Sequence, residues 1–502
     1  MYGPHNRIPL TQFVQPFHAA NVSVRQYPDL AHSVDAQFAL QEWDAPYAIS
    51  YGRQVVNPLP LFHNDIIIAR SNGSSNTIGV GAYSEGLNDD LNKFVWSAMG
   101  EDASIQLEDV VLQYASYFFG SDASENFFHG ILGLEKNWKN KTSSSKVSIE
   151  KTLEYLEKGM EDMVEKERKT SWRATMYVRR GVMDKYVYEL VQQDVALYNA
   201  AFHVLSKGGG GSSGQQQQCM RNIASASMIL EVVQQNITNA TLAALRLRIE
   251  NYAELLDNQV GADVLQTQDT MLNMNTIDKM LYLQSKYLLF FLQNLTKMQN
   301  PKDACRELLN FVMWENPGEG GYYDNVGSIL SSDHPHLVAA PGSHDVDPSC
   351  YNDVMQGGSN ALGSDQAEVR PSWLRYSMAM YDHPLLLRYT DIDYNEIYVW
   401  EVVMWNCWFD CTGDVVRWMV NDVPLTSWFV APLPMKKLSF QIPLELLSKN
   451  GVLEISCQRV AGLGGNGKTC QVSEAWLKKI TKQRKQTHEE KQRSTLEMGQ
   501  IK

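Results

Sequence analysis

The sequence lacks the features that mark several classes of protein. Residues 281–292 are apolar, but this run is too short to cross a bilayer and predicts a buried helix. The N-terminus carries no signal peptide. None of the seven cysteines forms a CxxC pattern, which argues against a structural metal. The net charge of −13 argues against a nucleic-acid partner. We therefore expect no membrane span, no metal and no cofactor.

The common catalytic motifs are also missing. The chain has no nucleophile elbow around a serine or cysteine, no HExxH and no dinucleotide-binding fingerprint. Residues 462–474 contain GLGGNGK, which superficially matches a phosphate-binding loop. No helix of the right register follows it and its surroundings are rich in strands, so we expect a tight loop on a β-sandwich. Among enzyme classes, these absences favour carboxylate chemistry.

The composition is that of a globular protein, with 44% hydrophobic and 20% charged residues in 502. That length accommodates about three domains. Residues 1–120 alternate between short apolar strands, at 22–26 and 78–82, and helices, at 9–19, 41–53, 91–99 and 107–118. Two strand–helix units cannot close a barrel. Either earlier units are missing, so that the region is the C-terminal end of a (β/α) barrel, or it packs in some unusual way.

Residues 121–315 predict an up-and-down helical bundle that supports the rest of the chain. Ser148 is placed to cap a helix whose apolar residues step by four and three. Residues 172–190 predict another helix, rich in tyrosine and arginine. The low-complexity segment 208–218, GGGGSSGQQQQ, predicts a flexible loop.

Residues 316–477 predict a loop-rich linker followed by a C-terminal β-sandwich. Short β-rich runs separated by turn residues recur at 385–389, 397–405, 415–420, 438–442 and 452–457. Residues 478–502 are polar and lysine-rich and predict a frayed or helical tail. The predicted fold class is therefore multidomain, with α/β, all-α and all-β parts.

Cysteines and glycosylation sequons bear on the compartment. Four cysteines lie in the last hundred residues, where they form one or two disulfides or serve as small buried hydrophobes. Chance would give roughly two or three Asn-x-Ser/Thr sequons in a chain of this size. Six occur, which favours a glycoprotein outside the cell or in the secretory pathway: Asn21, Asn72, Asn140, Asn236, Asn239 and Asn294.

Two carboxylates follow predicted strand ends, Asp29 after the first strand and Glu85 after the second. In a β/α barrel such positions meet at one mouth, where a carboxylate pair can cleave a glycosidic bond. Glu85 is equally well explained as a helix cap or ion-pair partner. Asp89 lies directly before a predicted helix, which favours a role as helix cap or ion-pair partner. It is also a candidate substrate contact. His32 is more typical of a loop hydrogen-bonder than of a catalytic base.

Aromatic residues gather in the same loops, including Tyr27, Trp43 and Tyr83. Sugar rings stack on such side chains, which makes these residues candidates for substrate binding. The alternative is ordinary core filling. A second cluster of aromatic and polar residues spans 322–325, YYDN.

Several segments together resemble a largely uncharacterised family of glycoside-hydrolase-like proteins from bacteria and plants. The similar segments occur in the family's order between residue 4 and about residue 477: YPDLAH (27–32), YGRQVVNP (51–58), YSEGLNDDLNKFVW (83–96), GLEKNW (133–138), NPGEGGYYDNVG (316–327), LLLRY (385–389) and GLGGNGKTCQVSEAWL (462–477). The resemblance implies a β/α (TIM) barrel, a helical domain and a C-terminal β-sandwich. It also implies a carbohydrate substrate or ligand.

The sequence departs from this family because most of the barrel has no counterpart upstream of Pro4. We expect a truncated relative in which Asp29, His32 and Glu85 match family motifs, with Asp29 and Glu85 nearest the reacting bond. One alternative is a non-catalytic carbohydrate-binding protein that uses the sandwich. Another is an incomplete product without activity.

Overall fold

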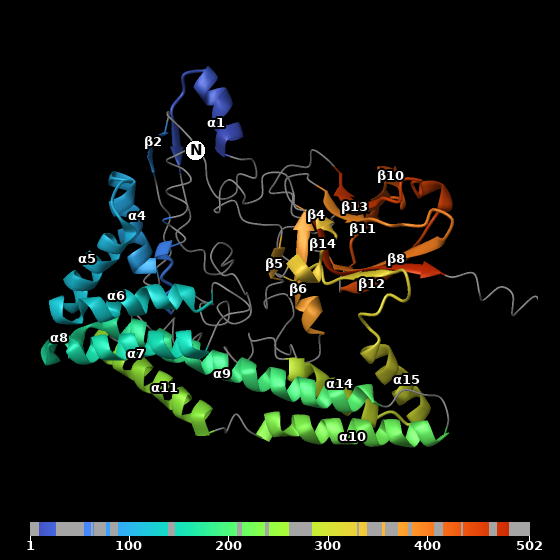
Figure 1. Ribbon diagram of the computed structural model, residues 1–502, viewed down its shortest axis with the longest axis horizontal. Coiled ribbons are helices and arrows are strands. Elements are labelled where there is room, and N and C mark those ends of the chain that lie inside the picture. The colour runs from blue at the N-terminus through green and yellow to red at the C-terminus, as the bar shows by residue number, and fades with distance from the viewer. Residues whose placement is uncertain are drawn as a thin grey trace, which may run out of the picture. The chain divides into compact units, whose positions relative to one another are not determined.

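The computed structural model describes residues 10–26, 55–61, 64, 77–80, 89–138, 146–207, 213–235, 240–260, 284–328, 331–338, 354–356, 370–379, 384–405, 415–432, 435–460 and 469–480. The chain forms two compact units (Figure 1). The helical unit comprises residues 1–310, 341–352 and 358–371. The sandwich unit comprises residues 311–340, 353–357 and 372–502. The four-part division expected from the sequence stays a prediction.

The helical unit begins with a β/α arrangement. After α1 (Leu10–Ala19), strand β1 (Val24–Gln26) pairs in parallel with β2 (Thr77–Val80), and α4 (Asp90–Glu101) follows β2. Both strands and both helices were predicted to within three residues of these bounds. The pair is the one parallel sheet in the described part of the chain. The predicted helix 41–53 lies outside the described residues.

The rest of the unit is a helical bundle, as predicted. Its helices are α5 (Leu107–Phe119), α6 (Ser121–Lys136), α7 (Lys146–Asp162), α8 (Glu165–Thr170), α9 (Trp172–Ser206), α10 (Ser213–Gln235), α11 (Ala240–Val260), α14 (Gln284–Thr296) and α15 (Pro301–Val312). The long helix α9 packs against α7, α10, α11 and α14 (Figure 1). In α7, Ile149, Leu153, Leu156 and Met160 are buried, as their spacing predicts.

Three details of the helical prediction were wrong. Ser148 lies inside α7, which already includes Lys146, so it does not cap the helix. Helix α9 does not end near residue 190 but continues to Ser206, because no glycine or proline occurs between residue 190 and the glycines at 208. Residues 213–218, expected in a loop, form the first turns of α10, since glutamine is a good helix former.

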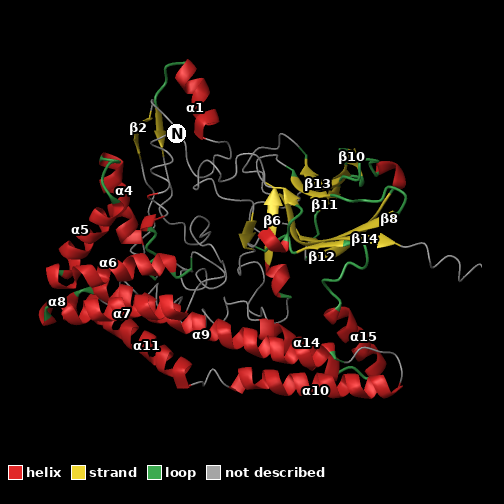
Figure 2. Ribbon diagram, viewed as in Figure 1, coloured by secondary structure: helices red, strands yellow, loops and turns green. Residues whose placement is uncertain are grey.

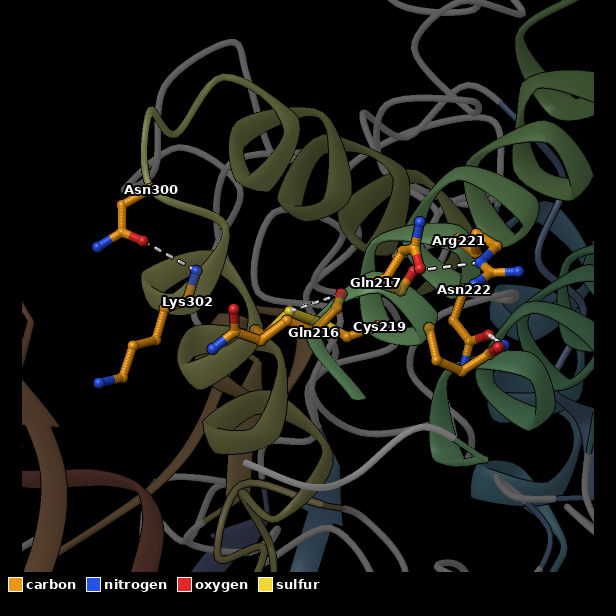
Figure 3. The surroundings of a disulfide bond; sticks show 9 residues. Gln216, Gln217, Cys219, Arg221, Asn222, Asn300 and Lys302 are labelled. Atoms are coloured by element: carbon orange, nitrogen blue, oxygen red, sulfur yellow. Dashed lines mark hydrogen bonds between the residues drawn. A yellow bond between two sulfur atoms is a disulfide. The ribbon is translucent and has the colours of Figure 1, made fainter. Parts of the chain in front are cut away.

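A disulfide fixes the start of α10. Cys219 in α10 is bonded to Cys305 in α15 (Figure 3). Helix α15 is itself capped, because the Asn300 side-chain oxygen accepts a hydrogen bond from the Lys302 amide at 3.0 Å. The bond therefore joins the N-terminal halves of two helices that lie far apart in the sequence.

The sandwich unit consists of two antiparallel sheets (Figure 2). The first has the order β10-β9-β13-β7-β4, with β11 also paired to β9; the second has the order β12-β8-β14-β6-β5, with β3 also paired to β14. The strands are β3 (Tyr322–Asp324), β4 (Leu337–Val338), β5 (Val354–Gln356), β6 (Arg375–Ala379), β7 (Leu385–Tyr389), β8 (Ile397–Trp405), β9 (Val415–Val420), β10 (Val423–Pro424), β11 (Phe429–Val430), β12 (Lys436–Ile442), β13 (Leu453–Arg459) and β14 (Thr469–Ile480).

The two sheets share one core. Trp400 on β8 and Trp418 on β9 are fully buried, with ring centroids 5.5 Å apart in an edge-to-face arrangement. A second disulfide, Cys457–Cys470, links β13 to β14 across the core and realises one of the alternatives open from the sequence. The fold class, with a helical part and a β-sandwich part, is confirmed.

Strand β14 was not foreseen. Residues 469–474, expected in a loop, and residues 478–480, expected in the tail, belong to this strand. A β-bulge explains the error, because Ser473 is an extra residue between Val472, which pairs with Met404, and Glu474, which pairs with Val403. Cys470 and Val472 face the core before the bulge, whereas Ala475 and Leu477 face it after the bulge. Apolar and polar residues therefore do not alternate with one constant period along this strand.

Two findings bear on the compartment. Disulfides persist in oxidising environments, and the two observed here agree with a secreted or extracellular protein. Among the described residues, no helix has both the length and the apolar character needed to span a membrane.

Candidate functional site

The parallel pair of strands defines the edge at which the sequence places its carboxylates. Val24 pairs with Thr77 and Gln26 with Val80, so both strands end at the same edge. Asp29 follows the end of β1 by three residues and Glu85 follows the end of β2 by five. Both acids lie outside the described residues, as do Tyr27, His32, Trp43 and Tyr83.

Asp89 is the one predicted site residue that the structure describes. It occupies the position before α4, but its side chain makes no capping hydrogen bond. Its carboxylate is fully buried and pairs with Lys93 one turn along the helix, at 3.3 Å. The ion-pair role that its position allows is thus observed, and its role as a substrate contact stays a prediction.

The next residue, Asp90, is held from two other helices. Arg173 on α9 donates to both carboxylate oxygens, from Nε at 2.7 Å and from Nη2 at 3.2 Å. Tyr114 on α5 donates its hydroxyl to Oδ2 at 2.8 Å, and Tyr177 donates to Tyr114 at 3.3 Å. Burial alone would raise the pKa of Asp90, but the hydrogen bonds from Arg173 and Tyr114 outweigh burial and hold the pKa below its ordinary value.

Segment 55–61 is tied to α4 through two asparagines. The Leu59 amide donates to Asn92 Oδ1 at 2.8 Å, and Asn92 Nδ2 donates to the carbonyl of Asn57 at 3.0 Å. Because Asn92 is fully buried, both halves of its amide are satisfied away from water. The amide therefore fixes the distance between the segment and the helix.

A second buried chain of hydrogen bonds holds the same segment from α9. Arg180 donates from Nη1 to the carbonyl of Val56 at 2.8 Å and from Nε to Asp184 Oδ1 at 2.7 Å. Asp184 also accepts from Asn137 Nδ2 at 2.8 Å, and Asn137 Oδ1 accepts from Thr152 at 3.0 Å. Arg180 and Asp184 are almost completely buried, so each needs the other for charge compensation.

Three segments that carry the family resemblance meet in this network. Residues 51–58 contribute Asn57, residues 83–96 contribute Asn92, and residues 133–138 contribute Asn137. None of these asparagines was a predicted site residue. The sequence offered one detectable sign of this network. Arg180 and Asp184 lie four residues apart, so they share one face of a helix and can form an ion pair. Their partners are 47 and 124 residues away, and no local pattern reveals such pairs.

The sandwich unit buries a carboxylate of its own. Glu474 on β14 is fully buried and accepts hydrogen bonds from three aromatic side chains. Trp314 Nε1 lies 3.1 Å from both carboxylate oxygens, Tyr323 donates its hydroxyl at 2.7 Å, and Trp373 Nε1 donates at 2.7 Å. We call these four residues the Glu474 cluster.

The predicted cluster at 322–325 also contains a buried acid. Asp324 accepts from the Tyr389 hydroxyl at 2.9 Å, and His336 Nδ1 lies 2.9 Å from its Oδ1. The His336 ring packs on Tyr389, with centroids 4.5 Å apart. Within the described ranges, no group of three or more histidine, cysteine or acidic side chains is placed to hold a metal ion.

Comparisons with known proteins identify no family. No family model and no curated protein matches the sequence. The extracellular domain of ANXUR2 from Arabidopsis thaliana aligns with 10% identity and a TM-score of 0.24, over 32% of this chain and 49% of that one. This chain thus spans about half the length of that plant domain.

Two glycosidases align with similarly low scores. A Bacteroides uniformis β-glucuronidase aligns with 12% identity and a TM-score of 0.22, over 33% of this chain and 19% of its own. The GH115 4-O-methyl-α-glucuronidase BtGH115A aligns with 7% identity and a TM-score of 0.24, over 93% of this chain and 57% of its own. Likenesses this weak carry no argument about function.

Proposed function

We propose that this chain is a glycoside-hydrolase-like protein that acts on carbohydrate through Asp29 and Glu85. The supporting observation is the parallel pairing of β1 with β2, whose ends at Gln26 and Val80 share one edge. Adjacent strands lie about 4.8 Å apart, and each further residue spans at most about 3.5 Å. Asp29 lies three residues beyond the end of β1, and Glu85 lies five residues beyond the neighbouring end of β2. These short connections allow the two carboxyl groups to lie about 5–9 Å apart, as paired glycosidase carboxylates do.

The proposed chemistry assigns one role to each carboxylate. One acid protonates the glycosidic oxygen as the bond to the leaving group breaks, and the other acts as a nucleophile on the sugar or as a base on water. Tyr27, Trp43 and Tyr83 would stack on the apolar faces of the sugar. His32 would hydrogen-bond a hydroxyl group. Asp89 would contact the substrate only if its ion pair with Lys93 opened, because its carboxylate is fully buried.

Hydrolysis of a panel of 4-methylumbelliferyl glycosides, neutral and uronic, by the full chain tests this proposal. Removing a general acid or base lowers the rate by about 10²–10⁴-fold. We expect this loss in Glu85→Gln and in Asp29→Asn. The matched control is Glu108→Gln, because Glu108 is an exposed acid on α5 and its loss should leave the rate unchanged. Full activity in Glu85→Gln would sink the catalytic assignment.

The alternative function is carbohydrate binding without catalysis, through the sandwich unit. One observation favours it: Trp314 and Trp373 are partly exposed, and their indole N–H groups point to the same buried carboxylate of Glu474. Aromatic rings fixed in this way can stack on sugars. Retardation of the full chain in gels containing polysaccharide, abolished by Trp373→Ala but not by Glu85→Gln, would support this alternative.

We also propose that the protein works outside the cell or in the secretory pathway. Two disulfides and the excess of glycosylation sequons support this location.

A further inference from the structure

We propose that Arg173 is a positioning residue for the reaction, and this inference rests on the proposed function. Its ion pair with Asp90 fixes the first turn of α4, the point at which the chain coming from β2 enters the helix. Glu85 lies five residues before Asp90 in the sequence. We call the set of Asp90, Arg173, Tyr114 and Tyr177 the latch.

The latch holds this end of the segment by interactions from outside its own helix. Arg173 is 83 residues from Asp90 in sequence and Tyr114 is 24 residues away. The other end of the segment follows Val80, which is fixed by pairing with Gln26. Val80 and Asp90 are thus each held by contacts from elsewhere in the unit, and the latch supplies those of Asp90.

The arrangement suits arginine in particular. The guanidinium offers two N–H groups to the two oxygens of Asp90, a fork that lysine cannot reproduce. Its central carbon lies 4.0 Å from the Phe118 ring centroid and 4.2 Å from that of Trp172. These rings hold the Arg173 side chain in one orientation. Its ion pair therefore fixes the orientation of the Asp90 carboxylate as well as its distance from α9.

The ion pair between Arg173 and Asp90 is separable from the stability of the bundle. Leu91, Val95, Trp96 and Met99 bury the core face of α4 independently of Asp90. Arg173 and Asp90 remain 24% and 20% exposed, at the margin of that core. Loss of the ion pair should therefore loosen the first turn of α4 without unfolding the helix.

Two measurements on the full chain test the latch: hydrogen exchange of the amides of Phe94 and Val95, and turnover of the most rapidly hydrolysed 4-methylumbelliferyl glycoside. The Phe94 amide bonds to the carbonyl of Asp90 in a regular helix, so fraying of the first turn exposes it. For Arg173→Met we expect exchange about tenfold faster at these amides and unchanged exchange at Met99. Because small displacements of a reacting group cost up to about 100-fold, we expect kcat to fall about 10–100-fold with KM nearly constant.

Controls separate positioning from folding. Arg221→Met removes an exposed arginine of α10 and should change neither readout. Arg173→Lys keeps the charge and should recover part of kcat, while the double variant Asp90→Asn/Arg173→Met should match the single variants because both remove one interaction. Unchanged exchange at Phe94 in Arg173→Met would overturn the latch. Faster exchange in a chain whose wild type hydrolyses no glycoside would instead refute the proposed function and leave the latch standing.

Discussion

Replacing Glu474 should destabilise the sandwich unit by an amount that depends on how many donors lose their acceptor. The carboxylate accepts from Trp314, Tyr323 and Trp373, which come from three separate segments of the unit. Glutamine retains the shape and one acceptor oxygen, whereas leucine retains only the approximate volume. The two substitutions therefore separate the effect of the charge from that of the hydrogen bonds.

The magnitudes follow from the three bonds. A hydrogen bond to a charged group contributes about 1.5–3 kcal/mol and a neutral one about 0.5–1.5 kcal/mol. In Glu474→Gln the remaining oxygen accepts neutral hydrogen bonds from the two indoles, and the new NH₂ group donates to the Tyr323 oxygen. Relief of the buried charge offsets part of the loss, so we expect a net destabilisation of about 2 kcal/mol. In Glu474→Leu two indole N–H groups are left without this acceptor, at about 1–3 kcal/mol each, and we expect about 4 kcal/mol.

Differential scanning calorimetry of the full chain checks these values, because separate units can give separate transitions. For a unit of this size, 2 kcal/mol corresponds to a fall in Tm of about 4–8 °C. Glu445→Gln, an exposed acid in the same unit, should shift the free energy of unfolding by less than about 0.5 kcal/mol. If Glu474→Leu melted like the wild type, the reasoning would be refuted.

Two further predictions concern the helical unit. Gly133→Ala should lower the free energy of unfolding, measured with urea, by about 1–3 kcal/mol, because the added methyl group would lie 2.4 Å from Thr152 Oγ1. Gly214→Ala adds a methyl group with nothing within 4 Å and should stabilise the protein slightly. Equal stability of the two variants would contradict this prediction. Since the pKa of Asp90 is lowered from 3.8 in the fold, its contribution is complete above about pH 4 and is lost as pH falls through the lowered pKa. The difference in unfolding free energy between wild type and Asp90→Asn, about 1 kcal/mol at pH 6, should thus shrink as the pH falls below 3.8, and a constant difference would count against it.

The elements with a constant period were predicted well from the sequence. Strands β7, β8 and β9 have the predicted bounds, since their apolar residues alternate between clear turn signals. Strand β14 escaped prediction because its bulge changes the alternation and because buried Ser473 and Glu474 look like loop residues. A local pattern cannot show that distant tryptophans supply the hydrogen bonds that allow Glu474 to be buried.

The candidate site was predictable only in outline. The apolar runs before Asp29 and Glu85 indicated two strands, and the structure pairs them in parallel. The residues that support α4 were missed, since Arg173 and Arg180 find their partners 83 and 124 residues away. Helical periodicity places such arginines on a helix but does not identify the carboxylate or carbonyl that each one binds.

The Cys219–Cys305 bond makes a closed covalent ring out of the chain between those two residues, which contains most of α10 and all of α11 and α14. The glycine run at 208–211 lies outside that ring. Natural or engineered changes in the length of the glycine run therefore leave the circumference of the ring untouched. A protease that cuts once within the ring leaves the two pieces of chain joined until the disulfide is reduced.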